Sequence, residues 1–181
     1  MNTPLNLGTS TQDNASYQNP SMYCTYTNSL TTEDDRALKT LARSISLSKN
    51  RFSLTFVRTA YPKAYLLSLL HERYNVVPNT IDIPIEAKQL YPIIQDYWNA
   101  SDRGLISALS ITGLDTVTYL DELLISTNQV RNEFQRHFAV PLIIWVNDEI
   151  IQKLVKLAPD FYNWASAPIT LGIPHPTRKA S

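Results

Sequence analysis

The feature that most constrains the fold is an apolar run at residues 142–146, which follows Pro141 and stops at the polar pair Asn147 and Asp148. A strand with one face in solvent alternates apolar and polar residues, whereas a run that is apolar throughout is typical of a strand buried on both faces. Helical patterns precede and follow this run, so it is expected to lie within a series that alternates strands and helices. Such a series indicates a parallel sheet covered by helices.

Four further strands are expected, at residues 51–58, 80–85, 105–112 and 168–173, with helices between them, the longest at residues 119–137. Pro84 and Pro168 fall in two of these strands, and proline removes a ladder donor, so those two strands are expected at the edges of the sheet. The order 5-1-4-3-2 satisfies this condition, and a flavodoxin-like 2-1-3-4-5 order is the alternative. The predicted fold is therefore an α/β three-layer sandwich with a mainly parallel five-stranded sheet.

The domain organisation follows from where apolar periodicity is found. Residues 1–30 are polar and lack a period of either kind, which predicts a disordered arm, and residues 174–181 form a polar tail. Residues 31–173 form a single α/β domain in this interpretation. Its first helix begins in the stretch 31–35, Thr-Thr-Glu-Asp-Asp, which supplies a capping hydroxyl followed by acidic residues in the first turn.

Composition limits the classes of partner. Sixteen basic residues balance sixteen acidic ones, so no net field favours nucleic acid. No apolar stretch approaches the ~20 residues that span a bilayer, so no membrane role is expected. Cys24 is the only cysteine, which excludes an internal disulfide, and a cytoplasmic location is expected. The three histidines show no metal-ligand spacing, and no metal or cofactor is predicted.

The connection after the first strand argues against phosphate chemistry. Ligands of an open α/β sheet bind at the carboxyl ends of its strands, where a phosphate cradle needs glycine-rich backbone. Residues 58–63 read Arg-Thr-Ala-Tyr-Pro-Lys and contain no glycine. Asp115 stands where a magnesium-holding carboxylate would stand, but the favoured interpretation for Asp115, and likewise for Asp148, is a helix cap.

A metal-dependent nuclease or hydrolase is the alternative function. Asp82, Glu86 and Lys88 match a short element in which two carboxylates hold Mg²⁺ and a lysine orients the attacking water. Pro84 falls between the carboxylates, and the favoured interpretation places Glu86 in the first turn of a helix. A nucleotide sensor that binds without hydrolysis is the third hypothesis.

An aromatic cluster near the C-terminus offers the strongest candidate for binding a protein. It contains Phe161, Tyr162 and Trp164, and its favoured interpretation is a lid on the core. Were it exposed, it would be the best partner-binding candidate, because Trp and Tyr dominate interface energetics.

Four stretches carry a resemblance to a known domain: residues 105–115, 126–136, 140–146 and 158–164, the last ending in Pro-Asp-Phe-Tyr-Asn-Trp. Together they resemble an N-terminal domain of bacterial signalling proteins, common in cyanobacteria, that continue into tetratricopeptide repeats or a signal-transduction ATPase. The resemblance covers roughly residues 36–172. It implies a degenerate P-loop NTPase-like domain that has lost its phosphate loop and serves interaction.

The leading hypothesis is therefore a non-catalytic signalling module that binds a protein partner, such as a repeat protein or an ATPase. Its partner-binding residues are expected at the strand-end crevice and in the aromatic cluster; they are Arg58, Asp115, Asn147, Asp148, Phe161 and Trp164.

Overall fold

The computed structural model describes residues 30–173, in which strands and helices alternate. The strands are β1 (Ser53–Thr59), β2 (Asn79–Asp82), β3 (Leu109–Thr112), β4 (Pro141–Val146) and β5 (Ile169–Leu171). The helices are α1 (Thr32–Leu47), α2 (Lys63–Tyr74), α3 (Leu90–Ala100), the 3-10 helix η1 (Leu114–Thr116), α4 (Leu120–Gln129), α5 (Arg131–His137), α6 (Asp148–Leu157) and α7 (Pro159–Tyr162). The expected arm and tail lie outside the described residues, apart from Leu30, which packs against the buried cluster beneath α1.

All five strands are parallel, in the order β2-β3-β4-β1-β5. This is the predicted 5-1-4-3-2 order read from the opposite edge. The flavodoxin-like alternative is wrong, because Ile144 of β4 lies opposite Phe56 of β1 on one side and Ile111 of β3 on the other. The edge strands were predicted correctly from Pro84 and Pro168, although both prolines lie just outside the strands that they mark.

The apolar run in β4 is buried on both faces, as predicted. Leu142 and Ile144 point into the cluster that contains α3 to α7, whereas Ile143 and Trp145 point into the cluster under α1 and α2. The indole N–H of Trp145 donates a buried hydrogen bond to Ser110 Oγ at 2.8 Å. Successive side chains of this strand thus serve opposite layers, which is why the sequence shows no polar alternation.

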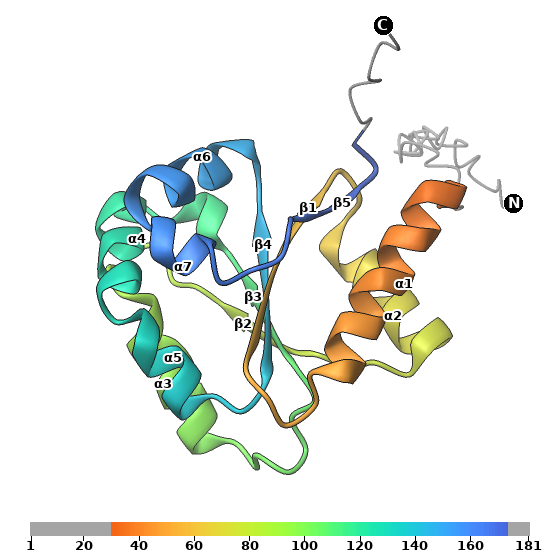
Figure 1. Ribbon diagram of the computed structural model, residues 1–181, viewed down its shortest axis with the longest axis horizontal. Helices are drawn as coiled ribbons and strands as arrows, with labels where there is room; N and C mark the ends of the chain where they lie inside the picture. Colours follow the sequence, from red (N-terminus) through yellow and green to blue (C-terminus); the bar gives the residue numbers. More distant parts are fainter. Residues whose placement is uncertain (1–29, 174–181) are drawn as a thin grey trace, which may run out of the picture.

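The helices form two layers around the sheet, with α1 and α2 on one face and α3 to α7 on the other (Figure 1). Leu38 and Leu41 of α1 and Leu66 and Leu70 of α2 are fully buried against the first face. Among residues 30–173, no helix is both long enough and apolar enough to cross a membrane.

Two element predictions were wrong. The helix predicted at residues 119–137 is divided into α4 and α5 at Val130, so α1 is longer than either part. The Oγ atoms of Ser126 and Thr127 both donate to the carbonyl of Leu123, and residues of this type are weak helix formers. The helix predicted from Glu86 begins only at Leu90, because residues 85–86 form a turn.

The strand boundaries also differ from the predictions. The strand predicted at residues 105–112 begins only at Leu109, and Leu105 is 80% exposed. The strand predicted at residues 80–85 ends at Asp82, two residues before Pro84. Propensity alone therefore overestimated the length of both strands on the β2 side of the sheet.

A buried carboxylate joins the start of α1 to the end of β5. Asp34 accepts hydrogen bonds from the Gly172 backbone N–H at 2.6 Å, the Thr31 hydroxyl at 2.7 Å and the Tyr61 hydroxyl at 2.8 Å. Thr31 Oγ1 in turn accepts from the Asp34 backbone N–H, which confirms the predicted helix cap. Burial by itself would raise the pKa of Asp34, but the bonds from Gly172, Thr31 and Tyr61 outweigh it and lower that pKa.

Candidate functional site

The connection from β1 to α2 is short and already hydrogen-bonded. The Ala60 N–H donates to the Leu171 carbonyl at 3.0 Å, and the Tyr61 N–H donates to Thr59 Oγ1 at 2.8 Å. Pro62, which has no N–H, precedes the first residue of α2. Phosphate binding at a helix N-terminus depends on backbone amides that face the ligand. Two of the amides in this connection instead face other parts of the protein.

Four of the predicted partner-binding residues lie at the carboxyl edge of the sheet. Arg58 at the end of β1 forms an ion pair with Asp148, and Lys63 Nζ lies 3.4 Å from Asp115 Oδ1. Asn147 Oδ1 accepts from the Ile150 N–H at 2.8 Å and caps α6. Each of these side chains therefore has a partner within the chain.

Both predicted aspartate caps were wrong. The cap of α6 is Asn147, because its extended backbone lets its side chain reach the Ile150 N–H, whereas Asp148 is already in the first turn. Asp115 lies in η1, and α4 begins after Tyr119 without a side-chain cap bond. The carboxylate of Asp115 is 47% exposed and faces Lys63.

A cavity of about 320 Å³ lies beside this edge and is rich in acidic residues. Asp121 and Glu149 both contact Lys153, at 2.8 Å and 3.6 Å. The hydrogen bond from Lys153 to Asp121 raises the pKa of the lysine, so the ammonium stays charged. Among residues 30–173, no cluster of three His, Cys, Asp or Glu side chains is arranged to hold a metal ion.

The three residues of the nuclease hypothesis have separate surroundings. Asp82 Oδ1 accepts from the Thr112 hydroxyl at 2.8 Å. Lys88 Nζ lies 3.3 Å from Glu122 and 4.1 Å from the centre of the Tyr119 ring. Glu86 is exposed in the turn after β2, so its placement in a helix was wrong.

The aromatic cluster is divided between the core and the surface. Phe161 is 1% exposed and packs against Phe134 with ring centres 5.1 Å apart, so it is a core residue and has no surface to offer a partner. Trp164 is partly exposed and meets Phe52 edge-to-face at 5.9 Å. The lid interpretation therefore holds for Phe161, and Trp164 remains a candidate for contact with a partner.

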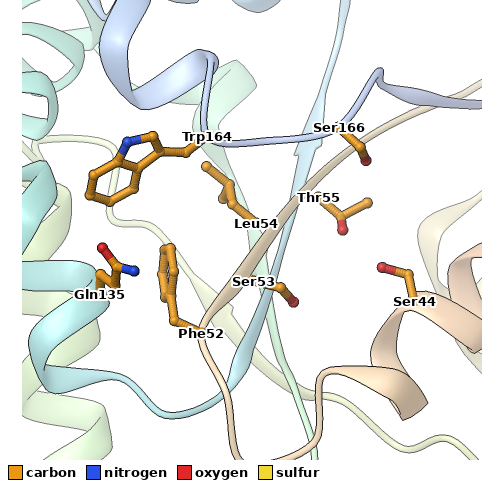
Figure 2. Close-up of a pocket in the computed structure, with 8 residues that line it drawn as sticks. All are labelled: Ser44, Phe52, Ser53, Leu54, Thr55, Gln135, Trp164 and Ser166. Carbon is orange, nitrogen blue, oxygen red and sulfur yellow. The ribbon is translucent and has the colours of Figure 1, made fainter.

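Trp164 and Phe52 lie at one side of a cavity of about 470 Å³ beside the first half of β1, which we call the β1 groove (Figure 2). Its lining residues are Ser44, Phe52, Ser53, Leu54, Thr55, Gln135, Trp164 and Ser166. None of them is ionisable. Figure 2 shows the chain from Trp164 to Ser166 passing above the groove, with Gln135 beside the rings and Ser44 on the opposite side.

Sequence reasoning identified Trp164 but missed the rest of the β1 groove. A signal was present in the first strand, where Ser53 and Thr55 alternate with Phe52, Leu54 and Phe56. Strands buried on both faces are typically apolar throughout, so two hydroxyl residues on one face of a central strand depart from that pattern. Ser44, Gln135 and Ser166 carry no comparable signal, because only the folded chain brings them to the strand.

Comparison with models of known protein families, with curated proteins and with solved structures gave no match. The resemblance to the N-terminal domain of bacterial signalling proteins therefore stays a prediction, and the function has to be argued from the site.

Proposed function

We propose that this chain is a non-catalytic protein-interaction module and that the β1 groove is its binding surface. The observation that carries the proposal is the Phe52–Trp164 pair, which lies at the side of a cavity of about 470 Å³. Partly exposed aromatic rings in a concave site are the usual anchors of protein binding. The other lining groups are hydroxyls, an amide and a leucine, which supply hydrogen bonds and shape.

The carboxyl edge supports the same proposal. Four charged side chains at this edge form the ion pairs Arg58–Asp148 and Lys63–Asp115. A charged ligand would therefore have to break contacts that already exist. The β1 groove requires no such exchange, because its lining is uncharged. We place the partner among signalling proteins, such as a repeat protein or an ATPase, as the sequence resemblance implies, and we place the module in the cytoplasm.

Site-specific photo-cross-linking in the native cell tests this function. The photoreactive residue p-benzoylphenylalanine would replace Ser166, which is exposed at the groove. In the control it would replace Ser46, which is exposed on α1 but does not line the groove. We expect a cross-linked protein from position 166 only, and its loss when Ser44→Arg fills the groove. Equal cross-linking from both positions, or no cross-link from position 166, would contradict the proposal.

A further inference from the structure

The outer edge of β1 is only half covered. β4 pairs with β1 from Ser53 to Arg58, whereas β5 pairs with it only from Val57 to Thr59. The first half of β1 therefore has a neighbouring strand on one side alone. Among the described residues, no backbone hydrogen bond joins the loop before β5, residues 163–168, to this half of the strand.

The register shows which backbone groups face the open side. The Ala60 N–H donates to Leu171 of β5, and backbone groups of alternate residues in a strand point to the same edge. Arg58, Phe56 and Leu54 therefore direct their N–H and C=O groups toward the β5 side. At Arg58 that position is occupied by β5, whereas no strand pairs with Leu54 on this side and the residue lines the β1 groove.

The groove has two chemically different walls, one on each face of the sheet. Ser53 and Thr55 point toward α1, where Ser44 completes a wall of hydroxyls. Ser53 Oγ is buried and has no hydrogen-bond partner among residues 30–173. On the other face, Phe52 and Trp164 form an aromatic wall beside Gln135.

We infer that the β1 groove binds an extended, uncharged peptide segment of a partner protein, which continues the row of β5 as an added strand. This inference rests on the proposed function and specifies the ligand. Another extended backbone can pair with the Leu54 N–H and C=O groups, as strands do when they add to the edge of a sheet. Because strand side chains alternate, one set of the peptide's side chains meets the hydroxyl wall and the other set meets the aromatic wall. The favoured ligand therefore alternates small hydroxyl residues with apolar or aromatic ones.

The test begins with a displayed library of random heptapeptides selected on the full chain. The affinity of each selected peptide would be measured by calorimetry with the wild type and with Ser44→Arg and Ser166→Arg, which fill the groove. Ser46→Arg is the matched control for Ser44→Arg, because both residues lie on α1. We expect uncharged, alternating sequences whose affinity falls by about tenfold or more in the two groove variants and stays unchanged in the control.

The best peptide would then be resynthesised with single N-methyl groups along its backbone. Strand addition predicts that N-methylation at alternate residues weakens binding by about tenfold or more, while the intervening residues tolerate it, because only one set of amides faces β1.

The outcomes separate the two proposals. Groove-dependent binding without this alternation would overturn strand addition and leave the proposed function intact. Selection that yields no peptide sensitive to Ser44→Arg and Ser166→Arg would overturn both.

Discussion

The hydrogen bonds of the Asp34 carboxylate predict how much its removal lowers the free energy of unfolding. The carboxylate accepts three hydrogen bonds, from Thr31, Tyr61 and Gly172, which lie far from one another in the sequence. Asp34 is 7% exposed. Hydrogen bonds to a charged group contribute about 1.5–3 kcal/mol each, although bonds that share one acceptor are not additive. Thr31 is an exposed residue, so its hydroxyl can bind water when the Asp34 carboxylate is removed. We therefore expect Asp34→Ala to lower the free energy of unfolding by about 2–3 kcal/mol in total.

Asp34→Asn separates the charge from the shape. The amide keeps one acceptor for the Gly172 N–H but loses the negative charge that strengthens all three bonds, so a loss of about 1–2 kcal/mol is expected. Asp35→Asn is the matched control, because its carboxylate is 48% exposed in a surface pair with Arg73 and should contribute less than about 0.5 kcal/mol.

The stabilisation by Asp34 should depend on pH, and the direction of this dependence follows from the pKa of its carboxyl group. Because the pKa of Asp34 is lowered below its ordinary value of 3.8 in the folded chain, the stabilisation is fully present above 3.8. It disappears as the pH falls through the folded-state pKa. Urea unfolding followed by tryptophan fluorescence should show a constant gap between wild type and Asp34→Asn from pH 7 to about 5, and a smaller gap in acid. An absent gap at pH 7, or one that widens in acid, would refute this reasoning.

Substitutions at three further sites test other contacts by the same unfolding assay. Gly172→Ala should destabilise the fold by more than about 1 kcal/mol, because φ is +69° there and a Cβ would lie 2.7 Å from the Tyr61 ring; an equally stable variant would contradict this. Asn147→Ala should cost about 1 kcal/mol by removing the α6 cap, whereas Asp148→Ala should cost less than about 0.5 kcal/mol, and the reverse order would restore Asp148 as the cap. Ser110→Ala leaves the buried Trp145 indole N–H without its acceptor and should cost about 1–3 kcal/mol. In a Trp145→Phe background, which has no indole N–H, a double-mutant cycle should show a smaller cost for Ser110→Ala.

The sheet could be derived from the sequence because its signals are local. The apolar run of β4 and the two prolines beside the edge strands show which strands are central and which lie at the edges. Both strand orders considered satisfy these signals, and the structure decides between them because β4 pairs with β1. The end of β2 was predicted wrongly, because Pro84 was assigned to a strand that stops at Asp82. A residue pattern shows which strands are central more reliably than it shows where pairing ends.

The site was less predictable because it depends on where pairing stops. Arg58, Asp115, Asn147 and Asp148 were expected together at the carboxyl edge, and the structure brings them there. The sequence could not show that β5 would begin opposite Val57 and leave the backbone of Leu54 without a paired strand on that side. That gap follows from the path of the chain between α7 and β5, and no periodicity encodes such a path.

The contact between Asp34 and Gly172 spans 138 positions in the sequence and brings the two ends of the described chain together. A short linker between residues 30 and 173 could therefore close the domain into a ring without stretching the backbone. The ring could be reopened in the loop between α3 and β3, where Leu105 is exposed. Such a permutant would keep both walls of the β1 groove, because none of the residues that line it lies in the opened loop.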